Sequence, residues 1–357
     1  MDWKNLVFEN KFARHFPGDE SGIPVSRMTP KVFYAKAQPT PVKNPKVVLV
    51  SSDLEKKFGR LSLLSNPDWA DFLSGNKLHP QSIPYAARYG GHQFGHWADQ
   101  LGDGRAITLG ELKDLQGQSW EIQLKGSGPT PYSRRADGRA VLRSSLREFI
   151  ASEALHHMGI ATTRALALLT TGENVTRDLL YSGNPKDEPG AIVVRMAPSF
   201  LRFGNFEILA ASGETENLKK LVQWTAERFY PETVGPSGNA DLKQLFCRIG
   251  ERTQEMILGW MRVGFVHGVM NTDNMSVLGL TIDYGPYGFL DSYEPDWTPN
   301  TTDLPGRRYS FKNQPAVAAW NLARLAEAFL ILEPELVANF QSELDRWQSS
   351  YEENYQK

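Results

Sequence analysis

Cysteine is almost absent from this sequence, which holds one thiol, Cys247, among 357 residues. One cysteine cannot form a disulfide within the chain, so a disulfide-stabilised secreted scaffold is excluded and a reducing compartment is indicated. Long apolar runs are also missing, because no window reaches the roughly 18 uninterrupted apolar residues typical of a membrane span. The first residues include Asp2, Glu9 and Asp19 and lack a long apolar core, which argues against a targeting peptide. We therefore expect a cytoplasmic protein with no membrane partner.

Charge of one sign is not in excess either. The chain has 39 Lys and Arg against 41 Asp and Glu, so its net charge is −2 and nothing global indicates a nucleic-acid partner. Two nucleotide-binding fingerprints are missing as well. The sequence lacks Gly-x-x-x-x-Gly-Lys-Ser/Thr, and it lacks Gly-x-Gly-x-x-Gly at the start of a helix. These absences argue against a P-loop NTPase and against a Rossmann cofactor site.

The apolar pattern present in the first half of the chain is typical of strands. Strands are expected at residues 46–51, 106–112, 119–124, 162–169 and 191–196. Apolar and polar residues alternate along 119–124, which predicts a half-buried strand. Ser52-Asp-Leu-Glu55 predicts a helix start with a capping box, and Gly102-Asp-Gly-Arg105 predicts a tight hairpin turn. A long helix is expected at 139–158.

The second half of the chain is mainly helical in pattern. Helices are expected at residues 241–263, 314–332 and 333–355, with two short strands at 275–278 and 280–283. We therefore predict an α+β fold with a strand-rich N-terminal lobe at residues 1–198 and a helical C-terminal lobe at 199–357. A site between two such lobes is the natural expectation.

The segment from Phe265 to Met275, followed by Ile282-Asp-Tyr-Gly285, carries the strongest chemical pattern. A protein-kinase-like fold holds Mg²⁺ with an Asn from its catalytic loop and an Asp from the next loop. Asn274 and Asp283 suit those two roles. Two polar turns around a hairpin would explain the same residues, but the combined pattern favours the metal site.

One position departs from the kinase pattern. An ordinary kinase has its catalytic Asp five residues before the metal-binding Asn, and here that position is Val269, which cannot accept a proton. Asp273 is the nearby carboxylate of suitable reach. We predict that Asp273 is the general base, although a turn residue would look the same.

A phosphate-binding cation is expected in the N-terminal lobe. Lys125 stands at the end of a predicted strand and would pair with a Glu on the helix that follows. Glu148 lies nearer the middle of that helix than Glu153 and is preferred. An exposed strand lysine is the alternative.

Arginine and histidine give weaker signals. Arg195 and Arg202 frame the lobe boundary, where two guanidinium groups could bind one phosphate. Three further arginines follow one helix stripe at 139, 143 and 147, which is more typical of a solvated face. His92 and His96 have zinc-like helical spacing, but the glycines around them make a helix doubtful, so hydrogen-bonding histidines are preferred.

Taken together, these segments resemble the selenoprotein O family of protein adenylyltransferases. The resemblance runs from about residue 33 to 322. Its most specific strings are Tyr89-Gly-Gly-His-Gln-Phe-Gly-His96, Leu101-Gly-Asp-Gly-Arg-Ala106, Leu124-Lys-Gly-Ser-Gly-Pro-Thr-Pro-Tyr-Ser-Arg134, residues 137–148 and residues 267–283. The resemblance implies a protein-kinase-like fold that binds ATP flipped, so that AMP moves to Ser, Thr or Tyr of a protein.

The resemblance also implies roles for individual residues. Nucleotide contacts fall to Gly102, Gly104, Arg105, Asp137 and Gly138. Phosphate binding falls to Lys125 with Glu148, and to Arg195 and Arg202. Asp273 corresponds to the catalytic base, and Asn274 and Asp283 correspond to ligands of Mg²⁺ or Mn²⁺. Self-modification is a further expectation.

Two features separate this chain from the family pattern. Members usually continue well past the point where this chain ends, and many close with a cysteine or selenocysteine pair, so we expect a shortened C-terminus and no redox control through a terminal thiol. Two alternatives to AMP transfer stay open. One is a kinase that transfers the γ-phosphate, and the other is a non-catalytic ATP-binding scaffold.

Overall fold

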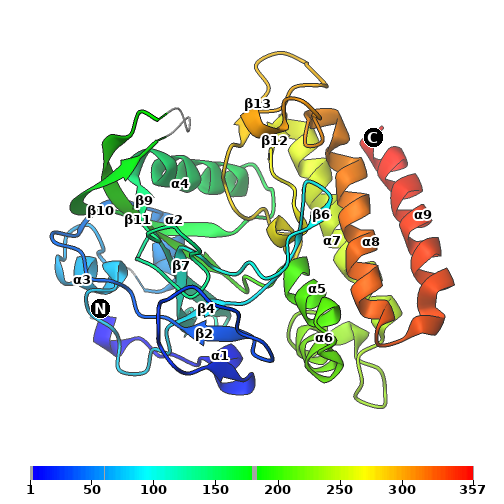
Figure 1. The fold of residues 1–357 in the computed structure, drawn as a ribbon, viewed down its shortest axis with the longest axis horizontal. Helices are drawn as coiled ribbons and strands as arrows, with labels where there is room; N and C mark the ends of the chain where they lie inside the picture. The colour runs from blue at the N-terminus through cyan, green and yellow to red at the C-terminus, as the bar shows by residue number, and fades with distance from the viewer. Residues whose placement is uncertain (1–2, 60, 179–182, 357) are drawn as a thin grey trace. The chain divides into compact units, whose positions relative to one another are not determined.

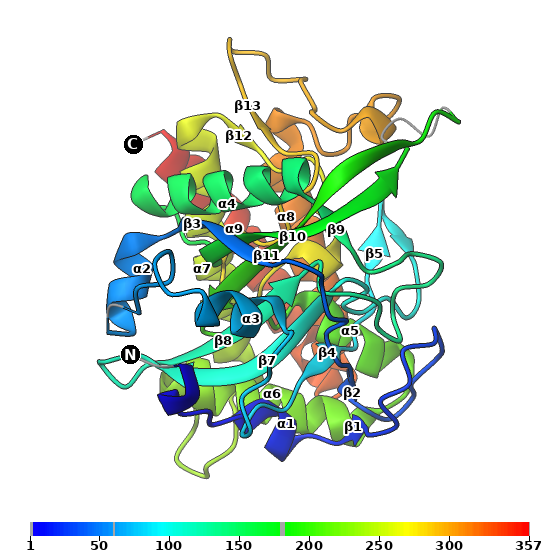
Figure 2. The same ribbon diagram turned by 90° about the vertical axis from the view of Figure 1, so that its left-hand side faces the viewer.

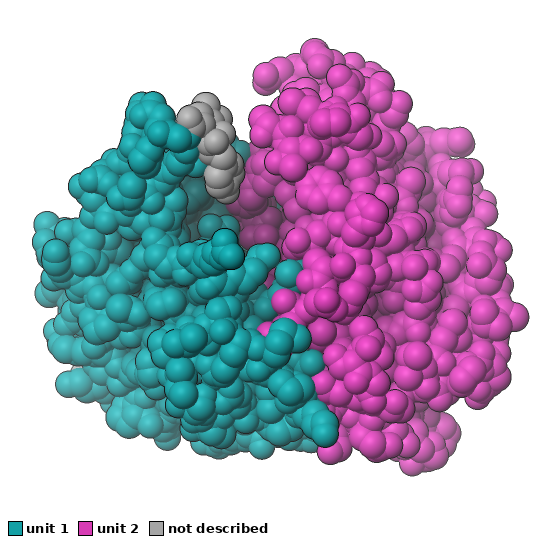
Figure 3. All heavy atoms as spheres, viewed as in Figure 1, with its two compact units in different colours: residues 1–88, 101–157, 163–200 teal, residues 89–100, 158–162, 201–357 magenta. Residues whose placement is uncertain are grey.

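The structure is a computed structural model that describes residues 3–59, 61–178 and 183–356. The chain forms two compact units, coloured separately in Figure 3. Unit 1 comprises residues 1–88, 101–157 and 163–200, and unit 2 comprises residues 89–100, 158–162 and 201–357. The α+β class is confirmed, because unit 1 is built on a large sheet and unit 2 is mainly helical (Figure 1). The exact domain boundary at 198/199 stays a prediction.

The described part of unit 1 contains one nine-stranded sheet, visible edge to edge in Figure 2. Its path runs β1-β2-β4-β7-β8-β11-β10-β3, with β9 added beside β11. The pairs are antiparallel except β1 with β2. The strands are β1 (Gly18–Asp19), β2 (Tyr34–Lys36), β3 (Lys46–Val50), β4 (Tyr85–Ala87), β7 (Ala106–Lys113), β8 (Ser119–Lys125), β9 (Ala140–Val141), β10 (Arg164–Arg177) and β11 (Lys186–Ala197).

Helices cover both faces of this sheet at β10 and β11. Alternate residues of β10 and β11 explain this, because successive side chains of a strand point to opposite faces. Leu168 and Val193 pack with Phe149 of α4 (Leu142–His157) on one face. Leu169 and Val194 join the larger core with α2 (Ser52–Lys57) and α3 (Asp68–Ser74) on the other face. A short helix, α1 (Lys11–His15), lies before the sheet in sequence.

Strand β8 was predicted to be half-buried, and this prediction is wrong. Its apolar residues enter the core, but Glu121, Gln123 and Lys125 are buried as well. Each of these polar side chains has a partner. Glu121 accepts hydrogen bonds from Ser199 at 3.0 Å and from the Phe200 amide at 3.2 Å, Gln123 donates to Asp103, and Lys125 pairs with Glu148. The alternation in sequence therefore marks a strand with one apolar and one polar buried face.

Two predicted turns also differ in detail. Ser51, not Ser52, is the N-cap of α2, and no side-chain cap hydrogen bond forms there. The hydroxyl of Ser51 bonds the carboxylates of Asp53 and Glu153 instead. Residues 102–105 form a loop before β7 and not a two-residue hairpin, because β7 pairs with β4 and β8.

Unit 2 contains five longer helices among its described residues. They are α5 (Phe203–Ala211), α6 (Thr215–Phe229), α7 (Leu242–Val263), α8 (Gln314–Leu330) and α9 (Val337–Tyr355). Helix α7 begins after Asp241, whose carboxylate accepts a hydrogen bond from the Gln244 amide at 2.9 Å. It ends at Gly264, which has a φ of 68°, the left-handed conformation that glycine adopts without strain. Because both ends carry a strong capping residue, the bounds predicted from the sequence, 241–263, agree with the structure to within one residue.

Short hairpins and one-turn helices complete unit 2. Strands β5 (His92–Gln93) and β6 (His96–Trp97) pair with each other, as do β12 (Phe265–Val266) and β13 (Gly288–Phe289). The predicted strands at 275–278 and 280–283 are wrong, because these segments do not pair with each other. Val277 bonds to the Leu201 carbonyl and Thr281 to the Ala161 carbonyl, so the backbone is satisfied by two separate neighbours. A 3-10 turn, Thr272–Asn274, precedes them.

Among the described residues, no helix combines the length and the apolar character needed to cross a membrane.

Candidate active site

A buried ion pair lies at the end of β8 in unit 1. The ammonium of Lys125 is 2.6 Å from a carboxylate oxygen of Glu148, and the two side chains are only 9% and 4% exposed. Lys125 is held in register between β7 and β11, while Glu148 projects from α4. Glu153, the alternative partner, instead bonds Arg164 at 2.6 Å. The ion pair that we predicted between Lys125 of this strand and Glu148 of this helix is therefore present.

Arg195 of β11 adds a second cation to the same carboxylate. Its guanidinium lies 3.2 Å from Glu148, bonds the side-chain oxygen of Gln123, and stacks on the Phe200 ring at 5.3 Å. The Nε atom of Arg195 is buried and has no hydrogen-bond partner in the described part of the chain. Two buried cations, Lys125 and Arg195, contact the same carboxylate. Cationic donors gathered at one place, one of them with a buried Nε that lacks a partner, make the group suited to an anionic ligand.

The glycine-rich loop 102–105 packs against a neighbouring tyrosine. Gly102 has a φ of 101°, and an added Cβ there would lie 2.4 Å from the Tyr132 ring. An added Cβ at Gly104 would lie 2.7 Å from the Tyr132 carbonyl oxygen. The buried Asp103 carboxylate accepts hydrogen bonds from the Ala87 amide and from Gln123, both at 3.2 Å. Packing alone thus requires these glycines, and Arg105 is exposed beside them; their contact with a nucleotide stays a prediction.

Asp137 and Gly138 have structural partners of their own. Asp137 binds Arg177 in an exposed, two-pronged pair at 2.7 and 2.8 Å. Burial alone would raise the pKa of Asp137, but the bonds from Arg177 outweigh it and lower the pKa. Gly138 has a φ of 68° and touches the Gly128 backbone so closely that an added Cβ would lie 2.0 Å from the Gly128 oxygen. These contacts fix the conformation of the loop. The role of Asp137 and Gly138 in nucleotide binding stays a prediction.

Asp273 is buried at the centre of the 3-10 turn in unit 2. Arg202 donates to its backbone oxygen at 2.7 Å, and Gln93 donates to its Oδ2 at 3.4 Å. Its Oδ1 atom is buried and has no hydrogen-bond partner among the described atoms. A buried oxygen without a donor is costly, so Oδ1 is the atom most ready to accept a proton or approach a cation.

The environment of Asp273 changes its acidity. Burial raises the pKa of Asp273 to about 7; Asp283 adds to the rise, while Arg202 and Gln93 oppose it. A base with a pKa near neutrality is well matched to proton transfer. A divalent cation bound nearby would lower this pKa through its own charge.

Asn274 and Asp283 lie near Asp273 in unit 2. The Asn274 amide nitrogen donates to the Val269 oxygen at 3.0 Å, which leaves its side-chain oxygen as the donor atom for a cation. Asp283 lies close enough to Asp273 to raise its pKa, and its φ is 65°, which is uncommon for a residue with a side chain. His267 supports this turn, because its Nε2 is 2.9 Å from the Ile282 carbonyl. An amide oxygen and two carboxylates are the hard donors that Mg²⁺ prefers, so these residues fit such an ion.

Comparisons with known proteins identify the family of this chain. The family model described as "Protein adenylyltransferase SelO" matches residues 23–357. This chain belongs to the SelO family. It is 57% identical to the "Protein nucleotidyltransferase YdiU" of Azoarcus sp. (strain BH72), over 90% of this chain and 62% of that protein. It is 56% identical to the protein of the same name from Methylobacillus flagellatus, over 92% of this chain and 64% of that protein.

The family resemblance predicted from the sequence is thus confirmed. The chain spans slightly less than two thirds of the length of these relatives. Among solved structures it is similar to ROP2 from Toxoplasma gondii, described as having a protein-kinase fold, with 10% identity and a TM-score of 0.32 over 67% of each chain.

The sequence did not identify the hairpin that holds the turn of Asp273. His92 donates from its amide to the Thr272 hydroxyl at 2.7 Å, and Phe94 donates from its amide to Asn271 at 3.3 Å. An added Cβ at Gly91 would lie 2.7 Å from Asp273 Oδ1. The segment Gly-Gly-His-Gln-Phe-Gly is distinctive in the sequence, but nothing in it indicates which residues it contacts. Gln93 and its partner Asp273 are 180 positions apart.

The two histidines of this hairpin do not form a helical metal pair. His92 and His96 lie on opposite strands, and His96 is exposed. His92 bonds the buried carboxylate of Glu207 through Nδ1 at 2.5 Å. The preference for buried, hydrogen-bonding histidines is confirmed for His92 in its hydrogen bond, although His92 is only partly buried, and is wrong about burial for His96, which is exposed.

Arg195 and Arg202 fall in different units. Arg195 binds Glu148 in unit 1, whereas Arg202 stacks on Tyr89 at 4.6 Å and bonds the Asp273 backbone in unit 2. Their predicted joint grip on a phosphate stays a prediction.

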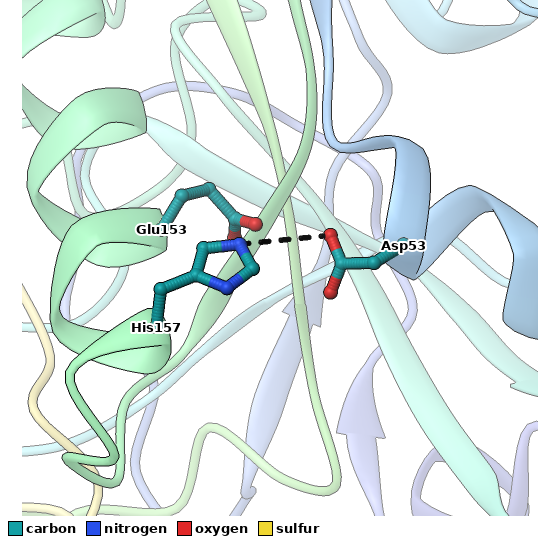
Figure 4. Close-up of side chains that lie close together, drawn as sticks. All are labelled: Asp53, Glu153 and His157. Atoms are coloured by element: carbon teal, nitrogen blue, oxygen red, sulfur yellow. Dashed lines mark ion pairs between the residues drawn. The ribbon is translucent and has the colours of Figure 1, made fainter.

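A separate group of potential metal ligands lies on unit 1 (Figure 4). Ligand atoms of Asp53, Glu153 and His157 all lie within 4.8 Å of one another. Arg164 already donates to both carboxylates, at 2.8 Å to Asp53 and 2.6 Å to Glu153. A guanidinium in that place repels a cation, so we interpret this group as an ion-pair network that ties α2 to α4 and β10.

Proposed function

We propose that this chain transfers AMP from ATP to the hydroxyl group of Ser, Thr or Tyr in proteins, its own chain included, in a reaction that requires Mg²⁺ or Mn²⁺. The observation that carries the proposal is the carboxylate of Asp273, which is buried and has one oxygen without a hydrogen-bond partner. The position that holds the catalytic Asp in an ordinary kinase is Val269 in this chain. Membership of a family described as protein adenylyltransferases supports it.

The residues of unit 1 would bind the nucleotide. Lys125 and Arg195 would bind phosphate oxygens through their positive charges, while Glu148 holds both cations in place. Because Arg195 Nε lacks a partner, a phosphate oxygen there would satisfy a donor that is otherwise buried without one. The remaining nucleotide contacts are proposed for Gly102, Gly104, Arg105, Asp137 and Gly138.

The residues of unit 2 would carry the chemistry. Asn274 and Asp283 would hold the cation, which when bound neutralises phosphate charge. Asp273 would orient the acceptor hydroxyl and take its proton through Oδ1, the oxygen without a donor. Arg202, which already fixes the Asp273 backbone at 2.7 Å, would add a positive charge for phosphate.

In the proposed step, the acceptor hydroxyl attacks the α-phosphate of ATP. The acceptor oxygen forms a bond to the α-phosphorus, and the bond from that phosphorus to the oxygen bridging to the β-phosphate breaks. Pyrophosphate leaves with the bond's electron pair, and the hydroxyl proton passes to Asp273. The product is a phosphodiester between AMP and the acceptor side chain.

Labelled ATP tests this proposal directly. The protein is incubated with Mg²⁺ and ATP labelled at the α- or the γ-phosphate, and label on protein is counted. Transfer of the α label, lost in Asp283→Ala and Asp273→Asn and kept in the exposed control Asp345→Ala, is expected. Transfer of the γ label alone would show a kinase, and ATP binding without transfer would show a scaffold.

A further inference from the structure

The tip of the β5–β6 hairpin is strained and partly exposed. Phe94 has a φ of 51° and Gly95 a φ of 86°, so both central residues of the turn are left-handed. Glycine accepts this conformation freely, whereas a bulky residue such as Phe pays for it in conformational energy. Phe94 is 37% exposed as a whole residue, so burial in a core does not explain its strained position. A strained aromatic side chain presented at the surface points to a function.

Arg308 packs against this tip. Its guanidinium atoms would lie 3.5 to 3.7 Å from a Cβ at Gly95, which is ordinary contact. The guanidinium also stacks on Trp320 at 4.7 Å. In the described part of the chain, Arg308 makes no ion pair with a carboxylate, and its Nε atom is buried without a hydrogen-bond partner. Arg324 lies on the same Trp320 ring at 4.9 Å, and its Nε also lacks a partner, but unlike Arg308 it pairs with a carboxylate, that of Glu327 at 2.7 Å.

A buried aspartate fixes the segment that carries Arg308. Asp303 is 2% exposed, and its carboxylate accepts hydrogen bonds from the amides of Arg308 at 3.0 Å and Tyr309 at 2.8 Å. Thr298 donates to the same carboxylate at 3.1 Å. The backbone at Arg308 is therefore held in one conformation, which limits the entropy that a ligand would have to overcome.

The same segment is linked to the turn of Asp273. The Tyr309 hydroxyl donates to Asn271 Oδ1 at 2.6 Å and accepts from the Phe94 amide at 2.9 Å. The ring of Tyr309 also lies 5.2 Å from the Phe94 ring. Phe94 directly, and Arg308 through its chain neighbour Tyr309, are thus linked to Asn271, two positions before Asp273 and within the same unit.

We propose that Phe94 and Arg308 form a docking surface for the protein that receives AMP, and that Arg308 selects an acceptor segment with an acidic side chain close to the hydroxyl. The proposal rests on the proposed function. Charge complementarity identifies the partner, because a guanidinium without a carboxylate of its own binds an incoming carboxylate bidentately. The exposed Phe94 ring would cover the apolar part of the same segment.

Binding of short peptides tests this surface without any turnover. Fluorescein-labelled peptides centred on one Ser are identical except that the flanking residues are Asp, Asn or Lys, and fluorescence anisotropy gives their Kd. We expect the Asp peptide to bind wild type about tenfold tighter than the Asn peptide. Arg308→Gln should abolish this preference, Arg308→Glu should reverse it towards the Lys peptide, and the matched control Arg324→Gln should keep it.

Phe94→Gly separates docking from structure. Glycine relieves the strained φ of 51°, so the melting temperature should not fall, while affinity for the Asp peptide should weaken severalfold. Equal peptide affinities in wild type and Arg308→Gln, or an equal loss in the Arg308 and Arg324 variants, would overturn the docking surface.

The α-label assay on the same peptides distinguishes the two proposals. Transfer with no dependence on flanking charge would overturn the docking surface and leave the proposed function standing. Charge-selective binding that depends on Arg308, without transfer by any variant, would support the docking surface and overturn AMP transfer.

Discussion

Gly91 and Asp273 are packed so tightly that no side chain fits between them. An added Cβ at Gly91 would lie 2.7 Å from Asp273 Oδ1, 2.9 Å from its Cβ and 3.0 Å from its amide nitrogen. Gly91→Ala must therefore shift the turn that carries the proposed base, and displacements of this size are costly for catalysis. We expect the rate of α-phosphate transfer to fall at least tenfold. Gly235→Ala is the control, because its Cβ meets one atom at 3.6 Å; equal rates in both variants would contradict the account.

Arg195 gives a second test at the scale of the residue. Arg195→Ala should raise the Kd for ATP about tenfold, since it removes one of the two cations beside Glu148. Isothermal titration calorimetry measures the Kd. Arg143→Ala, which removes an exposed arginine that binds Glu188 at 3.0 Å, should leave the Kd unchanged. An unchanged Kd in Arg195→Ala would count against a phosphate role.

Single residues also show which contacts could be predicted from the sequence and which could not. Lys125 and Glu148 were paired correctly because a strand and the next long helix are close in sequence and fixed in register. Gln93 and Glu207 were missed because their partners, Asp273 and His92, lie 180 and 115 positions away. No local pattern determines contacts across such distances, and the unit to which residues 89–100 belong follows only from the folded chain.

At the scale of the element, α7 shows what local signals can define. Its cap residues, Asp241 and Gly264, and its apolar stripe are all visible in the sequence, and its bounds were predicted to within one residue. The segment 275–283 shows the opposite, since its backbone is satisfied by residues 161 and 201, which local propensity cannot reveal. The polar face of β8 belongs to the same class, because its burial depends on partners from other elements.

The N-cap of α7 can be tested by itself. Asp241→Ala removes the hydrogen bond to the Gln244 amide at 2.9 Å and a negative charge from the start of the helix. The free energy of unfolding should fall by about 1 kcal/mol, as measured by urea denaturation. Lys243→Ala, an exposed change in the same helical turn, serves as control. A loss below a few tenths of a kcal/mol in Asp241→Ala would show that the cap does not stabilise the helix.

At the scale of the whole molecule, Glu9 joins the N-terminal segment to the sheet of unit 1. It accepts a hydrogen bond from Ser119 at 2.8 Å and lies 3.0 Å from Lys113 and 3.1 Å from Lys11. Burial alone would raise the pKa of Glu9, but these three groups outweigh it and lower the pKa from 4.5 to about 2. The folded state therefore binds the proton less readily than the unfolded state.

The stabilisation from Glu9 is complete above its unfolded pKa of 4.5 and is lost as the pH falls towards its folded pKa of about 2. Glu9→Gln should lower the free energy of unfolding at neutral pH by on the order of 1 kcal/mol, allowing for solvent screening, and should flatten its decline at acid pH. Thermal unfolding across this range measures both effects, with the exposed Glu255→Gln as control. A decline as steep as that of wild type would contradict the assignment.

Intact-mass spectrometry of the protein after incubation with MgATP tests the central claim most directly. Self-modification is part of the proposed function, so the chain itself serves as the acceptor. The account predicts a mass increase equal to AMP that requires the divalent cation and disappears in Asp283→Ala. An increase equal to phosphate, or an unchanged mass in a protein that still binds ATP, would contradict it.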